Sequence, residues 1–307
     1  MINWVKKGLI FKPESLHPLA STRVMVPTPF LLNESLIRLY CGFCDSEGIS
    51  RIAYLDLDAE DSQRIMQISD SPVLDIGEDG TFDDNGLCPA SIVRVSDSVV
   101  YLYYFGFQKG IQVPFYMFSG LAISTDNAKT FKRFSRTPIL DRSNDEFLMR
   151  SCPSVIYDSS IKKFKMWYPA GSTFMSDLDK PVHKYHLRYL ESDDGINWGK
   201  IGSVVLRTKN SDEYGLGRPF YFKYQGREIL FFSSRTHSLG YRIGGAFINE
   251  NYLRIDESLN FNVTVGDWDS EMLCYASFLD YKDRVYCFYN GNGLGQTGVG
   301  YSLLSFS

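Results

Sequence analysis

The chain has 307 residues and a formal net charge of −4, and aromatic residues make up 15% of it. Its charges of both signs are dispersed without a run of Lys or Arg, which argues against nucleic acid or a membrane surface as the main partner. The sequence contains no apolar stretch of the length that a membrane span or a signal peptide requires, so we expect a cytoplasmic protein with no membrane span.

A short pattern recurs five times along the chain, and each copy opens a run of short predicted strands. The copies lie at 26–30, 88–92, 152–156, 218–222 and 274–278. Their aligned positions are 62, 64, 66 and 56 residues apart, and such a period indicates a repeat architecture.

The units are predicted in chain order. The first has strands at 26–31, 36–43, 51–57 and 64–74, the second at 89–95, 99–106, 119–124 and 131–139, and the third at 153–158, 163–169, 186–191 and 198–206. The fourth has strands at 219–224, 228–234, 241–247 and 251–256, and the fifth only at 275–280, 284–290 and 298–304. Residues 4–11 are expected to supply the missing strand. The sequence therefore predicts an all-β, five-bladed β-propeller with four antiparallel strands per blade, forming a single domain over 1–307 and closed by the N-terminal strand joining the C-terminal blade.

Antiparallel geometry sorts the loops between two rims. The first strand of a blade starts on the rim where the second strand ends, and we call this the pocket rim. The turns at 124–131 and 192–198 lie on the opposite rim and are similar to the Asp-box turns of sialidase-type propellers, in which an Asp caps its own hairpin. We therefore interpret Glu191, Asp193 and Asp194 as structural.

The pocket rim gathers carboxylates, arginines, amides and aromatic residues around the expected central pocket. Such a mixture suits a sugar, because aromatic rings stack on its faces while charged and amide groups bind its hydroxyls. The expected substrate-binding residues are Arg23, Asp45, Asp83, Arg150, Arg218, Arg235, His237, Trp268, Asp269 and Asn290.

Two carboxylates just before inner strands are the candidate catalytic residues. Glycosidic cleavage needs one carboxylic acid to protonate the leaving oxygen and a second group to attack or to activate the attacking group. Glu271 is expected to be the acid if burial beside Trp268 stabilises its protonated form, and Asp84 would act as base or orient the substrate. The alternative is that both residues cap strand-entry turns.

The arginines allow two interpretations. Arg150, Arg218 and Arg235 would face one corner of the pocket beside His237 and bind phosphate or a carboxylate through their planar guanidinium groups. Alternatively, they balance the acidic residues in a salt-bridge network, whose other members would be Asp83, Asp84, Glu146 and Glu271.

Two insertions, 107–116 and 172–185, are expected to wall the site as loops. His183 lies in the second and is expected to be solvent-exposed and not a metal ligand. The six cysteines are interpreted as small apolar positions and not as a disulfide framework or a metal site. We expect no cofactor.

The whole layout resembles the five-bladed propeller glycosidases and phosphorylases of glycoside hydrolase families 32, 43 and 130. It is most similar to uncharacterised relatives that are often associated with surface-polysaccharide genes. The segments that carry this resemblance are Val26-Pro27-Thr28-Pro29, Phe82-Asp83-Asp84-Asn85-Gly86, Trp268-Asp269-Ser270-Glu271-Met272 and Tyr289-Asn290-Gly291-Asn292-Gly293. The resemblance implies carbohydrate chemistry on a sugar or glycan substrate.

One departure from that pattern bears on the reaction. Hydrolases of families 32 and 43 carry an Asp at the head of the first inner strand, where this chain has Val26-Pro27-Thr28, and Asp45 is a weak substitute. The missing Asp, the arginines and the expected cytoplasmic setting favour glycosyl transfer to or from phosphate or a phosphate-bearing sugar over simple hydrolysis. The alternatives are a non-catalytic sugar-binding propeller and a sialidase-like hydrolase.

Overall fold

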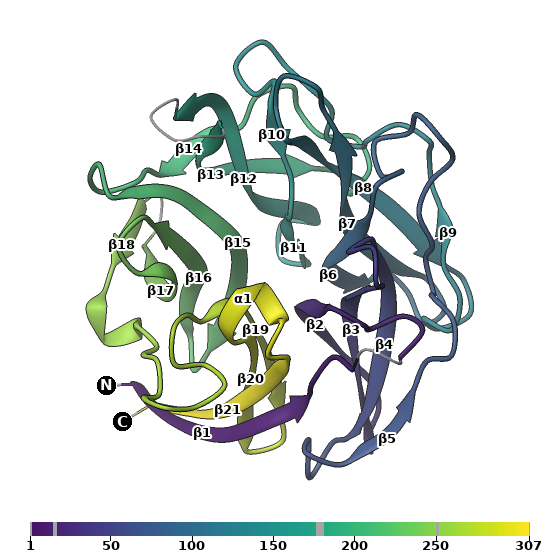
Figure 1. Ribbon diagram of the computed structural model, residues 1–307, viewed down its shortest axis with the longest axis vertical. Coiled ribbons are helices and arrows are strands. Elements are labelled where there is room, and N and C mark those ends of the chain that lie inside the picture. Colours follow the sequence, from purple (N-terminus) through teal and green to yellow (C-terminus); the bar gives the residue numbers. More distant parts are fainter. Residues whose placement is uncertain (1, 15–16, 176–180, 250–251, 307) are drawn as a thin grey trace.

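The computed structural model describes residues 2–14, 17–175, 181–249 and 252–306, and strands make up most of them (Figure 1). The all-β prediction is confirmed. In this described part, helical structure is limited to a 3-10 turn at Glu257–Leu259 and the short α1 at Asn292–Gly295, and no helix there has the length and apolar character to cross a membrane.

Antiparallel pairing joins the strands into groups that follow the sequence. The first group is β2 (Arg23–Asn33), β3 (Leu36–Cys44), β4 (Ser50–Asp58) and β5 (Ile65–Ile68). The second is β6 (Leu87–Arg94), β7 (Val100–Lys109), β8 (Phe115–Ser124) and β9 (Lys132–Arg133). The third is β11 (Ser154–Asp158), β12 (Lys163–Met175), β13 (Val182–Ser192) and β14 (Ser203–Leu206), preceded by the two-residue β10 (Met149–Arg150). The fourth is β15 (Glu213–Tyr224), β16 (Arg227–Thr236), β17 (Gly240–Asn249) and β18 (Tyr252–Ile255).

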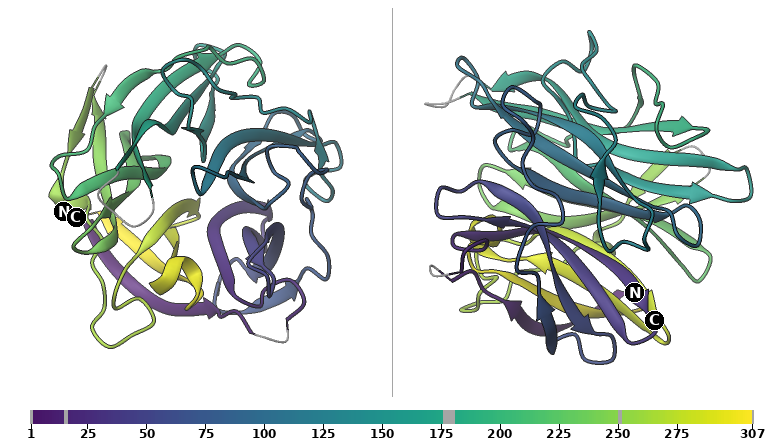
Figure 2. Two further views of the ribbon diagram at one scale, coloured as in Figure 1. Left: turned by 45° about the horizontal axis from the view of Figure 1, so that its top comes forward. Right: turned by 90° about the vertical axis from the view of Figure 1, so that its right-hand side faces the viewer.

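The last group contains both ends of the chain. It consists of β19 (Cys274–Tyr281), β20 (Arg284–Asn290), β21 (Val299–Phe306) and β1 (Ile2–Phe11), in the order β1-β21-β20-β19. Strand β1 pairs antiparallel with β21, with Ile2 opposite Phe306. The two ends of the chain consequently lie side by side (Figure 2).

The first strands of the groups lie nearest the centre of the molecule, and the later strands lie further out (Figure 1). Strand β2 contacts both β6 and β19, β6 contacts β11, β11 contacts β15, and β15 contacts β19. We call β2, β6, β11, β15 and β19 the inner strands. The residues at their heads therefore gather from distant parts of the sequence.

The second, third and fourth groups are not separate sheets. Parallel pairing of β10 with β8, and of β13 with β15 at Tyr185 and Gly215, merges them into one sheet. The reason is that the segment leading into an inner strand runs beside the third strand of the preceding group. The outer strands are also shorter than predicted: β9 covers only Lys132–Arg133, and the chain meets β8 again only at the isolated pair Ser119 and Leu140.

The two expected wall loops are mostly extended hairpins. Strands β7 and β8 reach Lys109 and Phe115, so only 110–114 connects them, and β13 already begins at Val182. Residues 176–180 of the second insertion lie outside the described residues. The prediction of an exposed His183 is wrong, because this side chain is only 4% exposed on β13 and its ring lies 5.0 Å from that of Phe115.

The turns on the rim opposite the pocket rim have the capping role that the sequence indicates. Asp126 accepts hydrogen bonds from the amides of Lys129 and Thr130 through the same carboxylate oxygen, at 3.1 and 3.0 Å. Tyr40 of β3 donates to the carbonyl oxygen of Ala128 in this turn at 2.8 Å. Tyr103 does the same to Gly195 in the turn after β13. These turns therefore join neighbouring groups.

Candidate active site at the heads of the inner strands

Four of the five inner strands have a carboxylate, just before the strand or at its start, that is buried against a hydroxyl of the second strand of the same group. We call these buried carboxylates the anchor acids. Tyrosine hydroxyls donate to three of them: Tyr104 to Asp83 at 3.1 Å, Tyr168 to Glu146 at 2.8 Å and Tyr289 to Asp269 at 3.0 Å. In the fourth group the acid is Glu213, which accepts from the Ser234 hydroxyl. The repeat indicates a structural function, since a buried carboxylate needs hydrogen bonds and a cation to be tolerated.

Each tyrosine-bound anchor acid also has a cationic partner. Asp83 pairs with Arg133 at 2.8 Å, and Asp269 pairs with Lys6 of β1. Asp83 and Asp269 were expected to bind substrate, and the structure instead engages both in these buried pairs. The sequence could not indicate this, because Arg133 and Lys6 come from outer strands far away in the sequence.

Arg150 belongs to the third anchor acid. It pairs with Glu146, and its Nη1 donates to the carbonyl oxygen of Asp141 at 2.7 Å. Arg188 also contacts Glu146, at 2.9 Å. For Arg150, the geometry therefore matches the salt-bridge interpretation and not the anion-binding one.

Three further expected binding residues contact backbone groups or a neighbouring ring within the protein. Asn290 is fully buried, accepts from the amide of Val26 at 2.8 Å and donates to the carbonyl oxygen of Val24 at 2.7 Å, so it joins the last group to β2. Arg23 donates to the carbonyl oxygen of Gly293 at 3.3 Å. Trp268 stacks on Tyr289 with ring centroids 5.1 Å apart.

Asp45 caps a turn and pairs with a neighbouring arginine. Its Oδ1 accepts from the amides of Glu47 and Ile49, and Arg51 binds its other oxygen at 2.6 Å. Burial alone would raise the pKa of Asp45, but these hydrogen bonds outweigh it and lower the pKa. Its carboxylate is thus occupied and does not replace the Asp missing from the head of β2.

Arg218 lies in the interior, between the inner strands. Its Nη2 donates to the carbonyl oxygen of Pro27 and to the hydroxyl of Thr28, both at 3.0 Å, and its Nη1 donates to the carbonyl oxygen of Ala90. Within the described residues it has no carboxylate partner, and desolvation by burial lowers its pKa. Arg150, Arg218 and Arg235 share no hydrogen-bond or ion-pair partner among the described residues.

Arg235 has a different environment, made of tyrosines. Its guanidinium carbon lies 4.9 Å from the ring centroid of Tyr214 and 5.3 Å from that of Tyr241. The hydroxyls of Tyr185 and Tyr241 are 3.2 Å apart, and the rings of Tyr241 and Tyr275 are 5.8 Å apart. We call these five residues the Arg235 cluster. No carboxylate pairs with Arg235 in the parts of the chain that the structure describes.

The Arg235 cluster is enclosed but still accessible. Arg235 and Tyr275 are only partly buried, although desolvation raises the pKa of Tyr275 well above its usual range. Burial lowers the pKa of Arg235, but the surrounding tyrosines more than reverse this effect and raise it. His237 is exposed and stacks on Tyr214 with centroids 4.4 Å apart. The structure therefore brings together two of the expected residues, Arg235 and His237.

Glu271 lies close to this cluster in the sequence and in space. Its carbonyl oxygen accepts from Arg242 at 2.8 Å, and the amide of Leu273 donates to the carbonyl oxygen of Tyr241. The Glu271 side chain is exposed, so the expected burial beside Trp268 is wrong. Exposure leaves its carboxylate available to a ligand.

Asp84 approaches the centre from the other side of β2. Its Oδ2 accepts from the amide of Gly80 at 2.9 Å, and its Oδ1 is buried without a hydrogen-bond partner among the described residues. The next residue, Asn85, donates its amide to the carbonyl oxygen of Phe107. Phe107 and Tyr275 both pack against the same small apolar cluster, which includes Cys88 and Cys152. The segments carrying Asp84 and Glu271 thus flank one central cluster.

The sequence interpretation missed the four tyrosines of the Arg235 cluster. One signal was present: Tyr241 lies directly opposite Arg235 in the β16–β17 pairing, just past the turn. A second was Tyr275, which stands where the other units have Pro at the head of an inner strand.

Known proteins of similar fold are glycoside hydrolases and related proteins. No protein-family model matches the chain. The uncharacterised protein Rv1502 of Mycobacterium tuberculosis is 29% identical over 303 residues, which cover 98% of this chain and 99% of that protein. A structure of a BT0996 complex with RGII has a TM-score of 0.76 at 17% identity, covering 99% of this chain and 92% of that one.

Two further solved structures have the same fold. A glycosyl hydrolase from Bacteroides ovatus has a TM-score of 0.73 at 16% identity, covering 98% of this chain and 93% of that one. The second structure belongs to a study of the GH130 family of mannoside phosphorylases, which contains glycoside hydrolases that target β-1,2-mannosidic linkages in Candida mannan. It has a TM-score of 0.70 at 16% identity, covering 98% of this chain and 93% of that one. At such identities the likeness establishes the fold, which is that of propeller glycosidases.

Proposed function

We propose that this protein is a carbohydrate-active enzyme that cleaves or transfers a glycosyl group at the heads of the inner strands. In this proposal the five antiparallel groups are the blades of one propeller domain, closed by β1. The contacts among the inner strands and the pairing of β1 with β21 support that arrangement. The similarity to solved glycoside hydrolases supports the class of reaction.

The observation that carries the proposal is the position of the Arg235 cluster. It lies beside the segment of Glu271, and the small apolar cluster that includes Cys88 and Cys152 separates it from the segment of Asp84. Tyrosine rings and hydroxyls suit the faces and hydroxyls of a sugar. Arg235 lacks a carboxylate partner among the described residues, so its guanidinium can bind phosphate or a phosphate-bearing sugar in a planar, forked manner. His237, stacked on Tyr214, lies where it would contact the same ligand.

Glu271 and Asp84 are the proposed catalytic pair. Glu271 would donate a proton to the leaving oxygen once bound sugar covers its exposed carboxylate. Asp84 would use its unpartnered Oδ1 to accept a proton or to orient the attacking group. We propose phosphate, or a phosphate-bearing sugar, as the partner in transfer, and the cytoplasm as the place of the reaction.

The test is turnover of β-mannosides and other oligosaccharides, assayed with and without inorganic phosphate. Asp84→Asn and Glu271→Gln should each lower kcat/KM by roughly 100-fold or more, because each removes an acid–base group. The matched control is Asp79→Asn, an exposed acid in the same lead-in segment as Asp84, which should stay within about twofold.

The outcomes separate the alternatives. Glycosyl phosphate formed only when phosphate is present would support transfer, and free sugar formed without phosphate would support hydrolysis. Unchanged turnover in both variants would contradict the catalytic assignment. A wild-type protein that binds sugars without turnover would support a non-catalytic sugar-binding propeller.

A further inference from the structure

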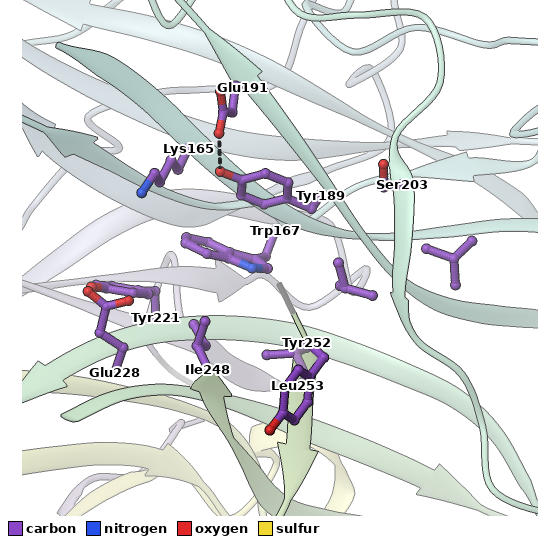
Figure 3. Close-up of a pocket in the computed structure, with 12 residues that line it drawn as sticks. Lys165, Trp167, Tyr189, Glu191, Ser203, Tyr221, Glu228, Ile248, Tyr252 and Leu253 are labelled. Atoms are coloured by element: carbon purple, nitrogen blue, oxygen red, sulfur yellow. Dashed lines mark hydrogen bonds between the residues drawn. The ribbon is translucent and has the colours of Figure 1, made fainter. Parts of the chain in front are cut away.

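A cavity lies away from the heads of the inner strands, between the third and fourth groups. It has a volume of about 600 Å³, within the range of small-ligand sites, and its lining comes from both groups (Figure 3). Lys165, Trp167, Tyr189 and Glu191 come from β12 and β13, and Tyr221, Glu228 and Tyr252 come from β15, β16 and β18. We call it the side cleft.

An aromatic surface forms the middle of the side cleft. The rings of Trp167 and Tyr221 are stacked with centroids 5.0 Å apart and an interplanar angle of 13°, and Tyr189 packs at an angle on Trp167. Tyr252 is also in the lining and is 63% exposed. The exposed Tyr252 and the half-buried Tyr189 and Tyr221 offer flat apolar faces of the kind that sugar rings cover.

Hydrogen-bonding groups border these rings on both sides. Tyr189 donates its hydroxyl to Oε1 of Glu191 at 2.7 Å, and Glu228 lies beside Tyr221 on the opposite side (Figure 3). The cation in the lining, Lys165, is already paired with Asp158 at 2.7 Å. Glu228 is itself paired with Lys223 at 3.4 Å, whereas Glu191 has no cationic partner among the described residues. The lining, with Glu191, Glu228 and Lys165, therefore carries a net negative charge, which disfavours an anionic ligand and suits neutral hydroxyls.

We propose that the side cleft is a second carbohydrate-binding site, which holds a segment of a neutral oligosaccharide outside the active site. The rings of Tyr221 and Tyr252 contact the sugar faces, and the carboxylates of Glu191 and Glu228 accept hydrogen bonds from its hydroxyls. Such a site anchors an oligosaccharide longer than the reacting unit. It involves none of the residues in the proposed catalytic pair or the Arg235 cluster.

The experiment uses full-length protein that carries Arg235→Ala, so that binding at the heads of the inner strands is weakened. A glycan array of neutral and acidic oligosaccharides selects a neutral probe, and calorimetry with that probe measures Kd. Adding Tyr252→Ala should weaken binding about tenfold, the scale of one lost aromatic contact. Tyr157→Ala is the matched control, because Tyr157 is 44% exposed on β11 and is not in the lining.

Four results would overturn the proposal. In the first, the array shows no neutral glycan bound to the protein, and in the second, the protein binds acidic glycans more tightly than neutral ones. In the third, Tyr252→Ala and Tyr157→Ala change the Kd equally. In the fourth, sedimentation shows that the protein is a dimer and that Tyr252→Ala dissociates it. The last result would make the cleft an interface between copies of this protein. Thermal unfolding of both variants checks that each remains folded.

Discussion

Arg218 of β15 donates a hydrogen bond to the carbonyl oxygen of Pro27 on β2 over 3.0 Å, although neither the two strands nor their groups are neighbours in sequence. The same guanidinium reaches Ala90 of β6. One side chain therefore connects three inner strands, and it does so without a carboxylate partner among the described residues. Its hydrogen bonds to backbone oxygens offset part of the cost of burying the charge.

Replacing this arginine tests its structural role. Arg218→Met should lower the free energy of unfolding by roughly 2–4 kcal/mol, because buried carbonyl oxygens lose their donor. Urea unfolding measures the change. Arg227→Met, at an exposed position of β16, should change it by less than about 0.5 kcal/mol. Equal stabilities of the two variants would show that relief of the buried charge cancels the lost hydrogen bonds.

The anchor acid of the third group should matter more than a surface ion pair. Glu146→Gln leaves the buried Arg150 and the half-buried Arg188 without their counter-ion and should cost about 3–5 kcal/mol of unfolding free energy. Glu78→Gln breaks a pair whose side chains are 69% and 77% exposed, and it should cost about 0–1 kcal/mol. Denaturant unfolding of both proteins provides the comparison, and a Glu146→Gln cost as small as that of Glu78→Gln would be incompatible with an anchoring role.

His183 should make stability depend on pH. Desolvation lowers the pKa of this buried side chain from 6.5 to about 4. Between these values the unfolded polypeptide takes up the proton and the folded protein does not, so stability present above pH 6.5 is lost as the pH falls towards 4. The loss from this residue is roughly 2–3 kcal/mol.

The measurement is the free energy of unfolding of wild-type protein and His183→Phe from about pH 7 to pH 4. The Phe variant keeps a ring beside Phe115 and Phe174 but has no titrating group, so its curve should fall less steeply over that interval. Parallel curves for the two proteins would show that His183 does not titrate as the structure implies. His186, whose pKa desolvation also lowers to about 4, contributes the same slope to both proteins.

The cysteines should be unreactive in the folded protein. All six are free and buried, and desolvation raises the pKa of Cys88 well above its usual range. Because the thiolate is the reactive form, Ellman's reagent should label none of the six rapidly under native conditions and all of them in guanidinium chloride. Fast labelling of a native thiol would reveal local opening near the inner strands.

Much of the strand pattern could be read from the sequence. The recurring Pro and Cys positions located the inner strands, and the apolar second strands were placed well: 36–43 was predicted and Leu36–Cys44 is observed. The bounds of the outer strands are predicted less well, because in the structure each outer strand pairs with the third strand of its group over only a few residues. The parallel pairings that merge three groups depend on how lead-in segments run past their neighbours, which local patterns do not encode.

The candidate site could be predicted only as a region. Adjacent acids such as Asp83 and Asp84 look alike in sequence, yet Asp83 is bound by Tyr104, 21 residues away, and by Arg133, 50 residues away. Asp84 keeps an oxygen without a partner among the described residues. Which acid is structural is therefore decided by tertiary contacts. The same holds for the arginines: Arg150 pairs with Glu146, Arg218 joins inner strands, and Arg235 lies among tyrosines.

The pairing of β1 with β21 has a consequence for biosynthesis. The ribosome makes β1 before β21, so β1 waits for its hydrogen-bonding partner until the almost 290 residues between them have been translated. A nascent form of this protein therefore carries a strand with two open edges, and the sheet of β1, β19, β20 and β21 is completed only after β21 has left the ribosome. Products of premature termination that lack β21 would keep that strand unpaired and would be substrates for chaperones or aggregation.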